Sequence, residues 1–146
     1  MAAKRYDVLV VGCGRIGWGF DEKPHEAPPR SHCGAVTNCR RTRLLGVVDT
    51  DRKIAEEGAV KYKCEWSDDV NAFGYTRLTK SRPHIIIVAT PPETHAEIVM
   101  EAADIPAVKA IVCEKPMALS VEAAEKMVAR CQRKGNRIRS SRCRRY

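Results

Sequence analysis

The 146-residue sequence contains no apolar stretch that approaches the length needed to cross a bilayer. Its N-terminus is basic at Lys4 and Arg5, but the apolar run behind them, residues 8–11, is too short for the core of a signal peptide. A chain of this length forms about one ordinary domain with a single core. We therefore predict a soluble protein that does not interact with membranes.

The seven cysteines include no C-x-x-C pair, and their number is odd. Neither a zinc cluster nor a disulfide framework is indicated, and we predict no metal site. Cys13, Cys64 and Cys113 fall in apolar, strand-like surroundings, where cysteine acts as a small hydrophobe. Reduced thiols of this kind favour a cytoplasmic location.

Acidic residues are absent from residues 130–146, a segment that contains eight basic ones. The chain has 26 basic and 18 acidic residues, so without that segment 18 basic residues remain to balance 18 acidic ones. The net charge of +8 therefore belongs to the C-terminal tail. Its arginines could bind phosphate backbones non-specifically, but only Tyr146 could stack on a base. Nucleic acid is thus a disfavoured partner.

Strand-like and helix-like segments alternate along the chain. Residues 84–89 (HIIIVA) form a continuous apolar run, which is typical of a strand covered on both faces. Further strands are predicted at residues 6–11, 43–48, 63–66 and 109–113, and helices at residues 52–63, 92–103 and 121–134. Residues 18–31, which include three prolines, are predicted to be an inserted loop. The alternation predicts an α/β fold with a doubly wound parallel sheet.

A glycine-rich turn follows the first predicted strand. Gly12, Gly14 and Gly17 match G-x-G-x-x-G, with Arg15 and Ile16 between the last two glycines. The first glycine permits a tight turn, the second lets backbone N–H groups approach a pyrophosphate, and the third lets a helix pack close to the strand. The helix N-terminus would then face the phosphates. Alone the pattern is weak, but its position after a strand predicts a dinucleotide site.

Asp49 ends the second predicted strand, where an acidic residue is expected in such a site. A carboxylate there can accept both ribose hydroxyls of the adenosine, which favours NAD over NADP. Arg52 opposes this preference because it could reach a 2′-phosphate, so NADP stays open as the cofactor. Asp51 is either a second ribose contact or, as we favour, a helix cap.

Thr90, Pro91 and Pro92 close the most apolar strand at the carboxyl edge of the sheet, where open α/β folds bind ligands. The two prolines lack N–H donors and stiffen this turn. His95 follows in the next helix. It is either a structural histidine, which we favour, or a catalytic one.

Glu114 and Lys115 end the strand predicted at residues 109–113, and Pro116 fixes the backbone behind them. An exposed ion pair is one interpretation of two adjacent charges. The other is a catalytic site, because this strand also ends at the ligand-binding edge of the sheet.

Four segments in this order resemble the Gfo/Idh/MocA oxidoreductases, a family named after glucose–fructose oxidoreductase and inositol dehydrogenase: VVGCGRIG, LLGVVDTD, VATPPETHAEIVMEA and VCEKPMALSVEAAE. The resemblance implies a Rossmann-type NAD(P)-binding domain. It implies hydride transfer between the nicotinamide and a hydroxyl or carbonyl carbon, usually on a sugar or polyol. It also implies that Lys115 binds and helps to polarise the reacting hydroxyl, and that the turn at residues 90–92 lies along the cofactor.

The resemblance also implies a larger second domain, which in the family supplies a catalytic histidine and the oligomer interface. We therefore predict that residues 1–136 are the dinucleotide-binding domain and that residues 137–146 are a basic tail that begins a missing second domain. The chain by itself is then expected to bind dinucleotide weakly, to self-associate and to lack turnover. Two alternatives remain, a non-catalytic NAD(H)-binding module or remnant and, less favoured, a basic-tailed nucleic-acid binder.

Overall fold

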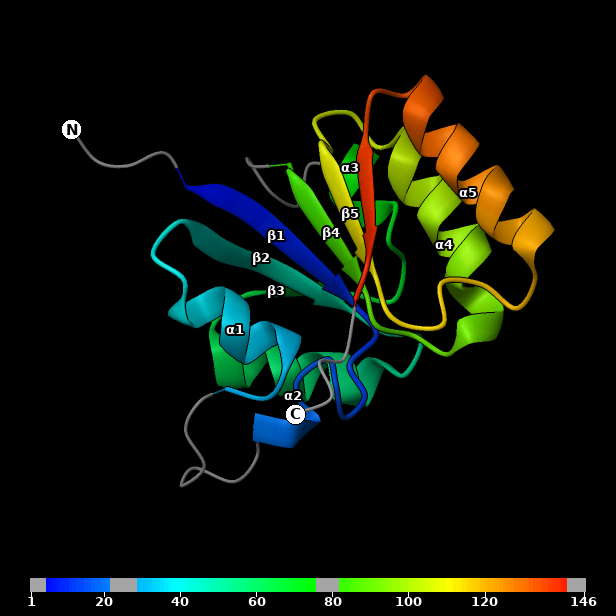
Figure 1. Ribbon diagram of the computed structural model, residues 1–146. Coiled ribbons are helices and arrows are strands. Elements are labelled where there is room, and N and C mark those ends of the chain that lie inside the picture. Colours follow the sequence, from blue (N-terminus) through cyan, green and yellow to red (C-terminus); the bar gives the residue numbers. More distant parts are fainter. Residues whose placement is uncertain (1–4, 22–28, 76–81, 142–146) are drawn as a thin grey trace.

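One sheet of six parallel strands organises the structure, which is a computed structural model that describes residues 5–21, 29–75 and 82–141. The strands are β1 (Tyr6–Val11), β2 (Thr42–Val48), β3 (Glu65–Ser67), β4 (Ile85–Val88), β5 (Ala110–Cys113) and β6 (Arg137–Ser140). They lie in the order β3-β2-β1-β4-β5-β6 (Figure 1). The order reverses between β1 and β4, which is where open α/β sheets bind ligands. The predicted doubly wound parallel sheet, a Rossmann fold, is confirmed.

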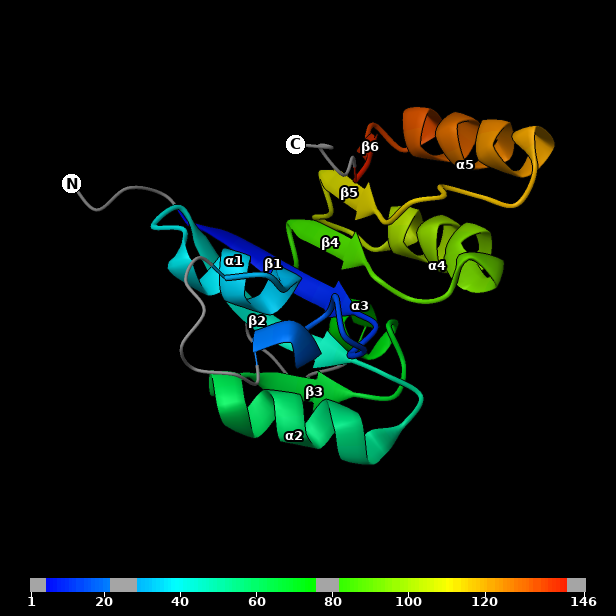
Figure 2. The same ribbon diagram turned by 60° about the horizontal axis from the view of Figure 1, so that its bottom comes forward.

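Helices cover both faces of the sheet (Figure 2). The longer helices are α1 (His32–Asn38), α2 (Arg52–Tyr62), α4 (Pro92–Asp104) and α5 (Val121–Arg133), and the short ones are η1 (Gly19–Asp21) and α3 (Ala72–Tyr75). Val8 and Val10 of β1 pack into the core beside α1 and α2, whereas Leu9 and Val11 pack into the core beside α4 and α5. Because β1 is buried on both faces, its residues 8–11 are apolar without alternation.

The glycine motif predicts that the turn after β1 leads directly into a helix. In the structure it does not lead directly into a long one. The chain makes a single turn after Gly17, forms η1, and enters α1 only at His32, with Ser31 as the N-cap. The Asp21 carboxylate accepts the backbone N–H groups of Arg30 (2.8 Å) and Ser31 (3.3 Å). These bonds stop the helical turn at η1 and close the insertion against α1. Residues 22–28 of the predicted loop lie outside the described residues.

The last strand of the sheet lies at its edge, after residue 136. Residues 137–140, assigned to the tail, form β6 and pair with β5 in parallel register from Arg137↔Ala110 to Ser140↔Cys113. Ile138 packs against the core beside α4 and α5, while Arg137 and Arg139 are exposed. The arginines alternate with Ile138 and Ser140, and an edge strand can expose one set of its side chains to water. The dinucleotide-type fold therefore includes β6.

Candidate dinucleotide-binding site

The three glycines of the motif have different surroundings, and at Gly12 and Gly17 these surroundings exclude a side chain. Gly12 has a φ of +99°, and a Cβ there would lie 2.6 Å from the carbonyl carbon of Ala89. A Cβ on Gly17 would lie 2.0 Å from the carbonyl oxygen of Gly12. A Cβ on Gly14 would have nothing within 4 Å. The turn of residues 12–17, here called the glycine turn, thus packs tightly at both ends and leaves open space at its centre, as backbone contact with a pyrophosphate requires.

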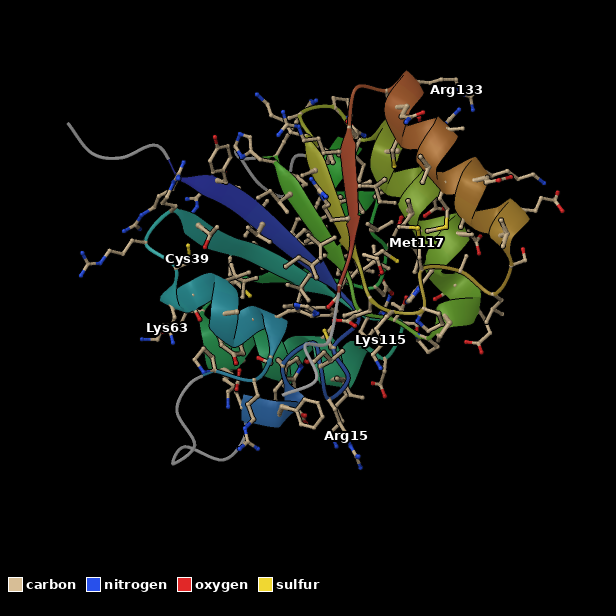
Figure 3. The ribbon with its side chains drawn as sticks, in the orientation of Figure 1. Arg15, Cys39, Lys63, Lys115, Met117 and Arg133 are labelled. Carbon is tan, nitrogen blue, oxygen red and sulfur yellow. The ribbon has the colours of Figure 1, made fainter. Side chains whose placement is uncertain are left out.

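Arg15 and Ile16 lie in the same turn but differ in their contacts. The Arg15 side chain is exposed and projects from the end of the sheet that also carries Lys115 (Figure 3). Ile16 is half-buried, and its carbonyl oxygen accepts the backbone N–H of His32 at 2.9 Å. Arg15 is therefore placed to meet an anion at the turn, whereas Ile16 anchors the start of α1.

Asp49 joins the end of β2 to the glycine turn. Its Oδ2 accepts the N–H of Cys13 at 2.7 Å, and its Oδ1 accepts the N–H of Asp51 at 2.9 Å. Each carboxylate oxygen keeps a further lone pair, so Asp49 can still accept hydroxyl groups from a ligand. The Cys13 thiol beneath it is buried, and burial together with the Asp49 charge raises the pKa of Cys13 to about 12. That thiol therefore stays protonated and acts as core.

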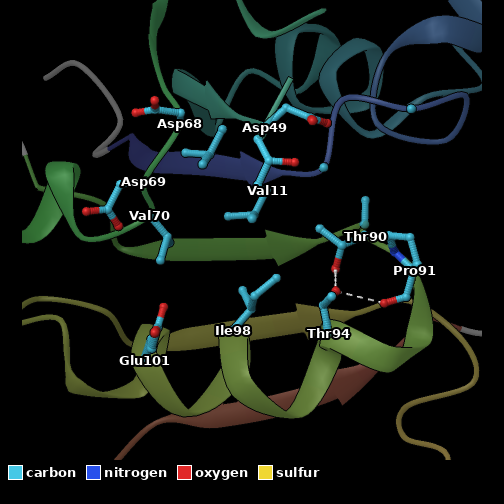
Figure 4. Close-up of a pocket in the computed structure, with 15 residues that line it drawn as sticks. Val11, Asp49, Asp68, Asp69, Val70, Thr90, Pro91, Thr94, Ile98 and Glu101 are labelled. Carbon is cyan, nitrogen blue, oxygen red and sulfur yellow. Dashed lines mark hydrogen bonds between the residues drawn. The ribbon is translucent and has the colours of Figure 1, made fainter. Parts of the chain in front are cut away.

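A pocket of about 690 Å³ opens beside Asp49 (Figure 4). Its walls come from the ends of β1 and β2, the loop after β3, the turn after β4, and α4. We call it the Asp49 pocket, and it is lined by Val11, Gly12, Gly14, Val48, Asp49, Thr50, Asp68, Asp69, Val70, Ala89, Thr90, Pro91, Thr94, Ile98 and Glu101. An apolar surface with a few polar groups at its rim is typical of small-molecule and cofactor sites.

The rim of the Asp49 pocket is acidic. Asp68, Asp69 and Glu101 line it together with Asp49. Burial, and then the nearby carboxylates of Glu97 and Asp69, raise the pKa of Glu101. This crowding of carboxylates favours hydroxyl or amino groups of a ligand over additional phosphates.

Thr90, Pro91 and Pro92 form the turn between β4 and α4, as predicted, and we call it the proline turn. The Thr94 hydroxyl lies 2.8 Å from both the Thr90 hydroxyl and the Pro91 carbonyl oxygen, which fixes the start of α4 (Figure 4). Thr90 and Pro91 line the Asp49 pocket, so the turn extends from this pocket toward the end of β5.

His95 is fully buried behind the proline turn. Its Nε2 lies 2.8 Å from the carbonyl oxygen of Thr90, and its Nδ1 lies 2.9 Å from the carbonyl oxygen of Pro116. Both ring nitrogens thus contact backbone of the two turns that flank the sheet edge. This arrangement favours the structural interpretation of His95 over the catalytic one.

Glu114 and Lys115 do end β5, but they do not pair with each other through their side chains. Glu114 Oε1 lies 2.8 Å from Nε2 of His32, and its Oε2 accepts the backbone N–H of Lys115 at 3.1 Å. Burial by itself would raise the pKa of Glu114, but hydrogen bonds from His32, the Lys115 backbone and Ser141 outweigh burial and lower it. The Lys115 side chain is exposed and, within residues 5–21, 29–75 and 82–141, forms no ion pair.

His32 is a site residue that the sequence analysis missed. It is the first residue of α1, and its contact with Glu114 spans 82 positions of the chain. No local spacing could indicate such a pair, since it depends on α1 packing beside the glycine turn. His32 therefore connects the glycine turn, through its backbone, to Glu114 and Lys115, through its ring.

Among the described residues, no group of three or more His, Cys, Asp or Glu side chains is arranged to hold a metal ion. No helix in that part of the chain is long and apolar enough to cross a membrane.

Comparison with known proteins decides the family. Residues 6–141 match the oxidoreductase family with the NAD-binding Rossmann fold, Gfo/Idh/MocA. This chain belongs to that family. The predicted resemblance is confirmed, and the glycine turn, the Asp49 pocket and the end of β5 belong to its NAD(P)-binding domain.

Relatives of known activity are sugar and polyol enzymes. Inositol 2-dehydrogenase of Rubrobacter xylanophilus is 32% identical over 126 residues, which cover 86% of this chain and 31% of that protein. The dTDP-3,4-didehydro-2,6-dideoxy-alpha-D-glucose 3-reductase of Saccharopolyspora spinosa is 28% identical. The match covers 90% of this chain and 35% of that protein. The chain thus spans about a third of the length of the relatives it matches.

Solved structures share the fold. GenD2 from gentamicin A biosynthesis, in complex with NAD, has a TM-score of 0.78 and 22% identity, over 96% of this chain and 35% of that one. The WlbA dehydrogenase from Bordetella pertussis, in complex with NADH and UDP-GlcNAcA, has a TM-score of 0.76 and 22% identity. The match covers 94% of this chain and 37% of that one. At these identities the likeness shows the fold alone.

Proposed function

We propose that this chain binds NAD(H) and serves as the dinucleotide domain of an oxidoreductase that transfers hydride to or from a sugar- or polyol-like carbon. One observation carries the proposal: the open centre of the glycine turn, the Asp49 pocket and Lys115 all lie at the carboxyl edge of one sheet. Family membership gives this edge its expected ligand. The relatives that act on inositol and on a dTDP-sugar support the substrate class.

The Asp49 pocket would hold the adenosine. Its apolar lining suits a base, while Asp49 would accept the ribose hydroxyls with the lone pairs that the backbone leaves unused. The pyrophosphate would cross the open space at Gly14, with Arg15 beside it. An acidic rim disfavours a 2′-phosphate, so we expect NADH to bind more tightly than NADPH.

Lys115 would act at the other end of the site. Bound NAD supplies a hydride acceptor, and NADH a hydride donor, at the nicotinamide. The Lys115 ammonium would donate a hydrogen bond to the substrate oxygen and polarise its bond to carbon. Glu114 would hold the Lys115 backbone in place through Oε2, while His32 fixes the Glu114 carboxylate. The proline turn would lie along the dinucleotide between the two ends.

A non-catalytic NAD(H)-binding module is the second candidate, and the exposure of Lys115 favours it. Lys115 does not line the Asp49 pocket, so its side chain does not face an enclosed space there. The nucleic-acid alternative loses support, because Asp104 pairs with Arg130 and Lys134 and so neutralises part of the basic segment. Residues 142–146, which include the rest of it, lie outside the described residues.

Titration with NADH and NADPH tests the proposal. We expect wild type to bind NADH, and Asp49→Ala to lose at least about tenfold in NADH affinity because two ribose hydrogen bonds disappear. Glu122→Ala, on the exposed surface of α5, removes the same charge and should bind NADH normally. Absence of NADH binding by wild type would contradict the proposal. Equal or tighter NADPH binding would refute the proposed preference.

A further inference from the structure

We propose that Asp68 enforces the preference for NAD(H) by holding the Arg52 guanidinium away from the 2′ position of the adenosine ribose. This inference rests on the proposed function and adds a residue that determines specificity. Arg52 is the group that could accommodate a 2′-phosphate, because it opens α2 three positions after Asp49. Its availability therefore decides which dinucleotide the pocket accepts.

Arg52 and Asp68 form a direct ion pair at the rim of the Asp49 pocket. Both Nε and Nη2 of Arg52 lie 2.7 Å from Oδ2 of Asp68. The Arg52 side chain is 73% exposed, so its only strong constraint among the described residues is this carboxylate. The guanidinium also lowers the pKa of Asp68, so the carboxylate stays charged at neutral pH.

The sheet places Asp68 beside Asp49. Val48 and Ser67 are partners in the parallel pairing of β2 with β3, and Asp49 and Asp68 are the next residues of the two strands. The loop after Ser67 is held by two side-chain bonds, in which Ser67 Oγ accepts the N–H of Asp69 at 3.0 Å and Asp69 Oδ1 accepts the N–H of Asn71 at 2.8 Å. Asp68 therefore holds Arg52 from a fixed position.

The charges around the Asp49 pocket explain why this ion pair should favour NADH over NADPH. A phosphate monoester carries about 1.5 to 2 negative charges at neutral pH, so a 2′-phosphate would be repelled by the carboxylates of Asp49, Asp68 and Asp69. Arg52, the first residue of α2, could offset them, but its charge is already neutralised by Asp68. Exposed ion pairs contribute little to folding stability, so this pair is expected to act on specificity rather than on the fold.

A double-mutant cycle tests the inference by calorimetric titration of NADH and NADPH at low ionic strength. In Asp68→Asn we expect NADPH affinity to rise about tenfold, because Arg52 becomes free to form charge-assisted hydrogen bonds with the 2′-phosphate. The readout is the ratio of NADPH to NADH affinity, which should rise in Asp68→Asn, while the midpoint of urea unfolding should stay close to that of wild type. The gain should shrink at high salt.

Two controls separate the release of Arg52 from a simple loss of negative charge. Asp69→Asn removes an equal charge from the same rim but leaves the Arg52–Asp68 pair intact, so its gain in NADPH affinity should be much smaller. The double variant Arg52→Ala/Asp68→Asn should lose the gain. Equal gains in Asp68→Asn and Asp69→Asn, or a gain that survives in the double variant, would overturn the inference. Failure of wild type to bind either dinucleotide would instead refute the proposed function, and this inference with it.

Discussion

The two ends of the candidate site differ in how much of this chain surrounds them. At the Asp49 end, three strand ends, a fixed loop and α4 enclose a pocket of about 690 Å³. At the Lys115 end, the side chain that would meet the substrate is exposed. The carboxylate of the neighbouring Glu114 contacts the ring of His32. One sheet edge is thus sufficient to build the pocket that we propose binds the nucleotide. Hydride transfer additionally needs a substrate held close to the nicotinamide and water kept out, which requires a second wall.

The largest expected effect is that of Gly17→Ala. This substitution places a side chain inside the glycine turn, which lies beside the Asp49 pocket. The new Cβ would meet the Gly12 carbonyl oxygen at 2.0 Å, and backbone cannot move aside as a flexible side chain can. We expect the free energy of unfolding to fall by about 3 kcal/mol, as for severe overpacking. Urea unfolding monitored by circular dichroism measures this.

Gly14→Ala is the matched control for that variant, because its Cβ meets nothing within 4 Å. We expect it to unfold at nearly the same urea concentration as wild type but to lose at least about tenfold in NADH affinity, since the methyl group occupies the space left for the pyrophosphate. Unchanged NADH affinity in Gly14→Ala would show that the pyrophosphate binds elsewhere.

A second prediction concerns the Lys115 end. The 146-residue chain should show no steady dehydrogenase turnover with NAD on a panel of sugars and polyols, because, in the part of the chain that the structure describes, Lys115 is exposed and lies outside the Asp49 pocket. Lys115→Ala should bind NADH within about twofold of wild type, since an exposed side chain outside the Asp49 pocket contributes little to affinity. Steady turnover that disappears in Lys115→Ala would mean that this chain builds its substrate site in another way.

A third, smaller effect should appear as a dependence of stability on pH. Since the pKa of Glu114 is lowered in the fold, its carboxylate adds stability that is present above its unfolded pKa and is lost as pH falls through the folded pKa. Wild type should therefore lose stability relative to Glu114→Gln over that acidic range. His32→Asn, which removes the ring contact, should reduce the difference. Parallel acid-unfolding curves for wild type and Glu114→Gln would contradict the assigned role of His32.

The smallest expected effect is self-association through the exposed edge of β6. An unpaired strand edge favours pairing between copies, but Arg137 and Arg139 of one copy would repel those of another. We expect weak association that increases with salt, measured by sedimentation velocity. Ser140→Lys, which adds charge to the same edge without removing an apolar core contact, should reduce it. Association that is unaffected by salt and by this substitution would exclude the β6 edge as the contact.

The sequence predicts most of the sheet and the Asp49 end, because those features have local signals. Residues 84–89 are apolar without interruption, the glycines have a fixed spacing, and Asp49 directly follows a strand. The exceptions are contacts between separate elements. His32–Glu114 joins residues 82 positions apart, and Arg52–Asp68 joins residues 16 apart, across α2 and β3. Neither pair has a periodic pattern, since each depends on how the elements pack. Residues 137–140 are predicted as the start of a basic tail, and their pairing with β5 likewise depends on how the elements pack.

The central claim is that this chain forms a complete site for the adenosine diphosphate half of the cofactor and only part of the site for the reacting half. Calorimetric titration of ADP-ribose against NADH tests it most directly, because ADP-ribose contains the first half and lacks the nicotinamide. If the Asp49 pocket and the glycine turn supply the affinity, the two dissociation constants should agree within about threefold. ADP-ribose binding that is undetectable, or weaker than NADH binding by more than about tenfold, would contradict the account.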